Sequence, residues 1–247
     1  MEIEIIAHIR TDFREKFGIP RQSGLVETAK GRIVFEPKYR SKEALRGMEE
    51  FSHLWLLWEC SENKRENWSA TVRPPRLGGK ERVGVFATRS SFRPNPIAMS
   101  VVKLEGIVED EQDGMVIEVS GVDMLDGTPI YDIKPYLPYA DSYPYASAGF
   151  GGEVFDHRLQ VDFPEELLCQ LPEDLRPLII ELIAEDPRTA FIKDEERIWG
   201  MTYADYNVRF RVRSVEGNPF RVATVVEVTQ LSDAQSGQPN EQPEELF

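Results

Sequence analysis

The stretch that decides the fold class is Ser100–Val122, SVVKLEGIVEDEQDGMVIEVSGV. Two runs rich in Val and Ile, 100–109 and 115–122, flank an acidic turn that ends in Gly114, which is the pattern of a β-hairpin. Further strands are expected at 2–10, 31–36, 53–60, 81–88 and 131–136, and one helix is expected at 41–51 with Ser41 as its cap. Many short strands with one helix predict a closed or nearly closed barrel rather than a parallel sheet.

A second unit follows a change of composition between Pro135 and Gly152. That stretch, PYLPYADSYPYASAGFGG, is rich in Pro, Tyr, Ala and Gly and is typical of a linker or surface loop. One or two helices are expected in 164–185, broken near Leu171–Pro172, with an apolar face made of Leu175, Leu178, Ile179, Leu182 and Ile183. Strands at 201–213 and 220–231 complete a small α+β domain.

The predicted organisation is therefore mainly β with some α. Residues 1–148 form the barrel, residues 149–231 the α+β domain, and residues 232–247 a polar tail that is expected to be disordered.

Several classes of protein are excluded by what the sequence lacks. The 247 residues contain no apolar run near the roughly 18 of a spanning helix, and the start MEIEIIAHIR has acids where an export signal has bases. We therefore expect a cytoplasmic protein without a membrane partner. Cys60 and Cys169 have no CxxC spacing, and His8, His53 and His157 have no metal-ligand spacing, so reduced thiols and no metal site are expected. No GxGxxG follows a strand, which argues against a Rossmann cofactor site.

The charge is distributed unevenly along the chain. The net charge is −14, which argues against nucleic-acid binding, but residues 64–103 carry nine bases and two acids. Such a segment is a candidate anion-binding surface or an ordinary solvated basic face. Trp68, Phe86 and Phe92 are interleaved with these bases and could stack nucleobases or belong to a core.

The loop Arg89–Ile97, RSSFRPNPI, is the richest candidate site in this segment. Pro94 and Pro96 stiffen the backbone on both sides of Asn95. Two arginines, Arg89 and Arg93, on a stiff loop can present guanidinium forks to a carboxylate or phosphate. A rigid connector with exposed arginines is the alternative interpretation.

Two further patterns remain open to two interpretations each. Asp126–Pro129, DGTP, is a turn sequence that could belong to a site or be an ordinary turn. Asp132, Lys134 and Tyr136 share one face of a strand and could form an active-site wall or a solvent-facing salt-bridge row.

Several long strings, in order, resemble the TsaA-like family, also called YaeB or TrmO. The strings are PRQSGLVETAKG (20–31), RGMEEFSHLWLLW (46–58), VRPPRLGG (72–79), GVFATRSSFRPNPIAMS (84–100) and DMLDGTPIYDIKPYLPYA (123–140). The resemblance covers about residues 5–148, and EDPRTAF (185–191) with YNVRFRV (206–212) resembles the family's C-terminal unit. Bacterial members are S-adenosylmethionine-dependent tRNA methyltransferases, which implies tRNA as a partner.

The resemblance implies a non-Rossmann barrel that binds S-adenosylmethionine near a homodimer interface. It also implies methylation at N6 of the N6-threonylcarbamoyladenosine beside the anticodon. Carried over by motif, the cofactor residues are Pro20, Arg21, Gln22, Ser61, Glu62, Arg89, Met99, Asp126, Gly127, Thr128 and Pro129. The chain departs from the family pattern at Ser61–Glu62, where members often have a pair that includes a His.

The residues expected to contact the tRNA substrate are Arg73, Arg76, Arg93, Asn95, Lys134 and Tyr136. Arg93 or Lys134 could pair with the threonyl carboxylate of the substrate. Asp132 and Tyr136 are of the right type for a base, but no catalytic residue is assigned. Alternatives are a non-catalytic module that binds S-adenosylmethionine or RNA, and a methyltransferase with another acceptor. The C-terminal unit could touch substrate or pack on the barrel.

Overall fold

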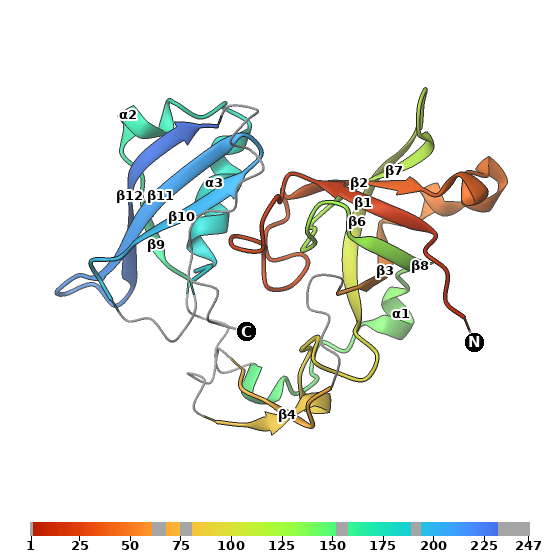
Figure 1. Cartoon of the computed structure of the whole chain (residues 1–247), viewed down its shortest axis with the longest axis horizontal. Helices are drawn as coiled ribbons and strands as arrows, with labels where there is room; N and C mark the ends of the chain where they lie inside the picture. Colours follow the sequence, from red (N-terminus) through yellow and green to blue (C-terminus); the bar gives the residue numbers. More distant parts are fainter. Residues whose placement is uncertain (1, 61–67, 75–80, 152–157, 189–193, 232–247) are drawn as a thin grey trace.

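The computed structural model describes residues 2–60, 68–74, 81–151, 158–188 and 194–231 (Figure 1). In the first part of the chain the strands are β1 (Ala7–Thr11), β2 (Lys30–Phe35), β3 (His53–Glu59), β4 (Thr71–Val72), β5 (Val83–Gly84), β6 (Ile97–Asp110), β7 (Gly114–Ser120) and β8 (Pro129–Pro135), followed by the helix α1 (Pro138–Asp141). The second part contains β9 (Gln160–Asp162), α2 (Glu165–Leu168), α3 (Leu175–Ala184), β10 (Ile198–Tyr203), β11 (Tyr206–Ser214) and β12 (Arg221–Gln230). The predicted mainly β fold with few helices is confirmed.

The longer strands of the first part pair in a ring. Their order is β1-β2-β7-β6-β3-β8, and β8 pairs antiparallel with both β3 and β1, so the sheet is a closed barrel. Its interior is filled by alternate apolar side chains such as Ile9, Ile33, Leu54, Leu56 and Ile117, each fully buried. This alternation is what the period of a β-strand requires when one face is buried. The hairpin β6–β7 turns at Asp110–Gly114 as the sequence predicts.

The second unit is a four-stranded sheet, β10-β11-β12-β9, with β9 parallel to β12. The apolar face of α3 is buried as expected, through Leu178, Ile179, Leu182 and Ile183. In Figure 1 the strands β10–β12 of this sheet (blue) lie beside the barrel, and the loop after β1 (red) reaches between the two.

Residues 12–29, the loop between β1 and β2, join the two units. The ring of Phe13 is 1% exposed and meets Tyr203 edge-on with centroids 5.1 Å apart. Phe17 stacks on Trp199 with centroids 5.9 Å apart. The backbone N–H of Ala204 donates to the carbonyl of Asp12 at 3.0 Å. Aromatic and backbone contacts together thus dock the C-terminal sheet on this loop.

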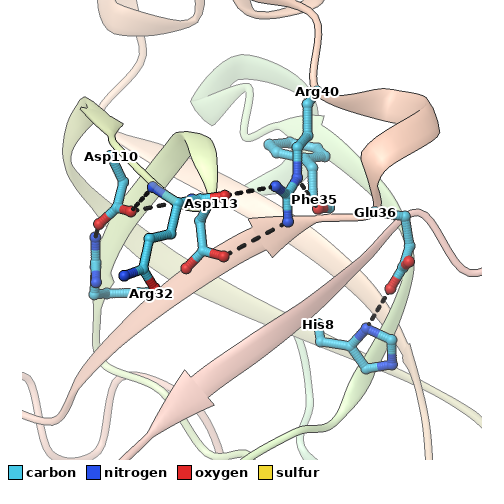
Figure 2. A network of polar contacts seen from close by, with 8 residues as sticks. His8, Arg32, Phe35, Glu36, Arg40, Asp110 and Asp113 are labelled. Atoms are coloured by element: carbon cyan, nitrogen blue, oxygen red, sulfur yellow. Dashed lines mark hydrogen bonds and ion pairs between the residues drawn. The ribbon is translucent and has the colours of Figure 1, made fainter.

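A polar network fixes the end of the barrel that carries the β6–β7 turn (Figure 2). Arg32 pairs with Asp110 at 3.0 Å, and the N–H groups of Gln112 and Asp113 donate to the same carboxylate. The bond from Arg32 and the two backbone N–H groups lower the pKa of Asp110 to about 2. Arg40 donates to the carbonyls of Phe35 and Gln112, both at 2.9 Å. These contacts hold the turn against β2.

Four expectations about secondary structure are corrected. Residues 41–51 form short 3₁₀ segments, Lys42–Leu45 and Met48–Glu50, because Gly47 has φ +83° between them, and Ser41 makes no side-chain cap. The strand expected at 81–88 is only β5 followed by a 3₁₀ turn. The strand expected at 201–213 is two strands, because Ala204, at φ +48°, turns the chain. The linker 135–152 includes α1.

Within the described residues, no helix has the length and apolar character needed to cross a membrane. The expected tail, 232–247, lies outside the described residues.

The packing of loop 12–29 on the second sheet can be tested at Gly18. This residue has φ +96°, and a Cβ there would lie 2.5 Å from Cγ of the buried Met201. Gly18→Ala should lower the free energy of unfolding by about 2–4 kcal/mol, as the sum of backbone strain and overpacking. Urea denaturation measures this loss.

Gly24→Ala is the matched control, because Gly24 also has positive φ, +77°, with no atom within 4 Å of the added carbon. It should cost about 1 kcal/mol from backbone strain alone. Equal losses in the two variants would show that Met201 does not pack on Gly18.

Candidate functional site

Three loops meet at one rim of the barrel because of the strand register. Glu59 pairs with Ile97 and Trp58 with Ile130, so the end of β3 lies beside the starts of β6 and β8. Ser120, at the end of β7, pairs with Lys30, at the start of β2. Loop 12–29, segment 60–96 and loop 121–128 therefore leave from the same rim, called here the candidate rim. Most of the residues predicted to bind the cofactor lie in these three loops.

The first contact across the candidate rim joins Gln22 to Arg89. The Arg89 guanidinium donates to the Gln22 side-chain carbonyl, and the Gln22 amide donates to the carbonyl of Arg21 at 2.5 Å. Arg89 is exposed, whereas Pro20 is buried. Two residues 67 positions apart, both predicted to bind cofactor, thus lie in direct contact.

Arg21 faces the second unit. Its guanidinium donates to the carbonyls of Asp186 and Arg188, at 3.0 Å and 2.7 Å. Arg188 is itself 5% exposed and pairs with Asp186 at 2.7 Å. Arg21 therefore ties the loop that carries Gln22 to the C-terminal unit.

The turn Asp126–Pro129 is bonded closely to β1. The Asp126 carboxylate accepts from the N–H of Thr11 at 3.0 Å and lies 3.8 Å from the Arg10 guanidinium. The N–H of Gly127, which has φ +75°, donates to the carbonyl of Ile9 at 2.8 Å. Thr128 is buried, and its hydroxyl donates to the carbonyl of Leu125 at 2.7 Å. These bonds explain the DGTP sequence as a rigid turn at the candidate rim.

Asp123 is a residue of this rim that the sequence reasoning did not single out. Its carboxylate accepts from the Ser100 hydroxyl at 2.7 Å, and the Trp58 indole N–H donates to the same hydroxyl oxygen at 3.0 Å. The hydroxyl of Ser23 accepts from the N–H of Val101 at 3.0 Å. The network around Asp123 thus joins Ser23, the residue after Gln22, to Ser100, the residue after Met99. The available signal was its place in the string DMLDGTPIYD.

Burial raises the pKa of Asp123 to about 6, against bonds from Ser100 and the backbone and the charge of Arg89. Burial also raises the pKa of the nearby Cys60 thiol, which the charge of Arg93 opposes. The thiol is therefore protonated at neutral pH, which is unsuited to a cysteine nucleophile. Asp123 is ionised at that pH, but burial of its charge lowers the stability of the folded protein.

The other predicted residues divide between the rim and the rest of the barrel. Met99 is 45% exposed near the start of β6, and Arg93 donates to the Thr88 carbonyl at 3.2 Å. Arg73 and Asn95 are exposed in the segment between β3 and β6. Ser61, Glu62 and Arg76 lie outside the described residues.

Lys134 and Tyr136 lie at the opposite end of β8 from Asp126–Pro129. Lys134 pairs with Asp132 at 2.7 Å, and their side chains are 62% and 43% exposed. The ring of Tyr136 lies 5.9 Å from that of Trp55, near the start of β3. The structure therefore does not bring these two residues to the candidate rim, and their contact with substrate stays a prediction.

No group of three or more His, Cys, Asp or Glu side chains that could hold a metal ion occurs among the residues described here. In the second unit, Arg209 pairs with Glu227 at 2.6 Å across β11 and β12.

The raised pKa of Asp123 predicts a pH-dependent stability. The folded protein keeps this proton up to about pH 6, whereas the ordinary value is 3.8, so native stability falls as the pH rises through that window. Asn cannot ionise. The free energy of unfolding of Asp123→Asn, relative to native protein, should therefore rise by about 1–2 kcal/mol from pH 5 to 7.5. Urea denaturation across this range measures the difference.

Asp110→Asn is the control, because the pKa of Asp110 is about 2 and its carboxylate stays ionised throughout the window. The difference between this variant and native protein should stay constant. A constant difference for Asp123→Asn as well would contradict the raised pKa.

Comparison with known proteins places both units. The family model described as the tRNA-methyltransferase O N-terminal domain matches residues 8–142, and the TrmO C-terminal domain model matches residues 156–231. A crystal structure of TrmO from P. aeruginosa superposes with a TM-score of 0.72 at 33% identity, covering 93% of this chain and 97% of that chain.

Curated relatives agree with these matches. The tRNA (adenine(37)-N6)-methyltransferase of Escherichia coli K12 is 46% identical over 222 residues, which are 85% of this chain and 93% of the relative. A second relative is the Pseudomonas aeruginosa protein RcsF, which is named as an S-adenosylmethionine-dependent methyltransferase. It is 41% identical over 83% of this chain and 90% of its own length. The chain belongs to the tRNA-methyltransferase O (TrmO) family.

Proposed function

We propose that this protein transfers a methyl group from S-adenosylmethionine to N6 of adenosine 37 in tRNA, with N6-threonylcarbamoyladenosine as the modified base. The observation that carries the proposal is the candidate rim, which gathers Gln22, Arg89 and the turn Asp126–Pro129 in a chain of the TrmO family. The 46% identity to the E. coli enzyme supports the reaction.

The chemistry of the rim suits S-adenosylmethionine. Its methionyl carboxylate matches the exposed Arg89 fork, and its ribose and adenine edges match amide, carboxylate and backbone groups at Gln22 and Asp126–Pro129. The ionised Asp123 adds negative charge that favours a positively charged sulfonium. We propose Pro20, Arg21, Ser61, Glu62 and Met99 as further members of this set, with Pro20 and Arg21 acting by holding the loop that carries Gln22.

The bound cofactor supplies an activated methyl group, so positioning by the protein can carry much of the rate. Gln22 and Arg89 would orient the donor, and the Asp123 network would fix the distance between their two segments. Arg93 would pair with the threonyl carboxylate of the substrate base. Arg73, Arg76 and Asn95 would contact the RNA backbone, where cations neutralise phosphates.

The wider organisation is proposed on the same basis. Residues 1–148 act as a non-Rossmann cofactor-binding barrel and residues 149–231 as an α+β domain that holds loop 12–29 in place. We propose that the protein acts as a homodimer in the cytoplasm, on the anticodon stem-loop of tRNA.

Arg89→Ala tests the cofactor role. Wild-type protein should transfer label from S-adenosylmethionine to tRNA, and the variant should raise the KM for S-adenosylmethionine about 10- to 100-fold, because a hydrogen bond to a charged group is lost. Arg46→Ala is the control, because Arg46 is exposed and pairs with Glu43 far from the candidate rim. Cofactor binding by wild-type protein without transfer to any tRNA would favour a non-catalytic module.

Arg93→Ala tests recognition of the threonyl carboxylate. The variant should lose about 10- to 100-fold in kcat/KM on threonylcarbamoylated tRNA, the worth of a charge-assisted bond. Its binding of tRNA without that modification should fall much less, because no carboxylate is present there. Arg93→Lys, which keeps the charge, should recover part of the loss. Unchanged turnover in Arg93→Ala would rule out this pairing.

A further inference from the structure

Two aromatic rings stand exposed together beside the candidate rim. Trp68 is 53% exposed and Phe86 is 72% exposed. Their rings are stacked, with centroids 6.3 Å apart and planes inclined by 25°. Adjacent exposed aromatic rings of this kind are a candidate contact surface for a partner. The pair is called here the aromatic platform.

The backbone holds the platform in place before any partner arrives. Thr71 pairs with Gly84 in the β4–β5 hairpin, and the N–H of Val85 donates to the carbonyl of Ala70 at 3.0 Å. Val85 is 1% exposed, so it anchors the 3₁₀ turn that points Phe86 outward. A preorganised surface loses little conformational entropy on binding.

Positive charge lies next to the platform. The Arg93 guanidinium lies 6.0 Å from the centre of the Phe86 ring. Within 68–74 and 81–96 the bases are Arg73, Arg82, Arg89 and Arg93, and Glu81 is the acid. Arg82 is held by Thr71, whose hydroxyl accepts from it at 2.8 Å. Flat rings interleaved with arginines are the pattern that binds single-stranded nucleic acid.

We propose that Trp68 and Phe86 stack an unpaired base of the tRNA loop that carries the target adenosine. This inference rests on the proposed function and adds a site to it. The target base must leave its stack to reach the methyl donor, and a neighbouring base stacked on the platform would stabilise the opened loop. A second copy of this chain is the competing occupant, and the experiments below separate it from RNA.

The test measures binding of an anticodon stem-loop RNA by fluorescence anisotropy. Trp68→Ala and Phe86→Ala should each weaken binding about 5- to 100-fold, because each removes one face of a base stack. Phe86→Tyr keeps the ring and should bind like wild type. Phe220→Ala is the matched control, because Phe220 is also 53% exposed but lies in the second unit.

An abasic RNA identifies the contact. A stem-loop that lacks the stacked base should bind wild-type protein 5- to 100-fold more weakly, and Phe86→Ala should show no further loss with it. The affinity for S-adenosylmethionine should not change in either alanine variant, which separates this site from the cofactor site.

Two results would overturn the platform while leaving the proposed function intact. One is wild-type RNA affinity and turnover in both alanine variants. The other is a change in the molecular mass of the variants, measured by sedimentation, without a change in RNA affinity. That result would assign the rings to an interface between two copies of this chain. The proposed function fails differently, when wild-type protein transfers no methyl group to tRNA.

Discussion

The antiparallel pairing of β3 with both β6 and β8 is the constraint on which the candidate site depends. It sets Glu59 beside Ile97 and Trp58 beside Ile130, and so brings segments separated by tens of residues to one rim. A slip of one residue would turn the buried Leu54 and Leu56 outward, so the packing of the core fixes the register. A register slip that displaced the loops of the candidate rim would therefore also expose the apolar core.

The C-terminal unit has a structural part in this arrangement. It packs on loop 12–29 through Phe13 and Phe17, while Arg21 donates to two of its carbonyls. The loop that carries Gln22 is therefore fixed from both sides, by the barrel and by the second sheet. Arg188 is buried at the contact between the two units, whereas contact of the C-terminal unit with substrate stays a hypothesis.

The sequence predicts the barrel strands well where apolar periodicity is strong, as in 53–60, 100–109 and 115–122. It predicts them poorly where a turn sets the end of an element. The turn at Ala204 carries no glycine signal, and Gly47 breaks a segment of helical composition. At the site, motif resemblance names Gln22 and Arg89, but their contact needs the fold. Asp123 was missed because its significance lies in burial and in partners 23 residues or more away in sequence, such as Ser100. For Lys134 and Tyr136, alternation along a strand shows a shared face but not which end of the barrel they occupy.

The most direct test of the account is amide chemical-shift mapping on addition of S-adenosylmethionine. The shifts should concentrate at the candidate rim, at Gln22, Arg89, Met99 and residues 126–128. Shifts confined to the opposite end of the barrel, around Arg40 and Asp113, or to the β10–β12 sheet, would contradict it.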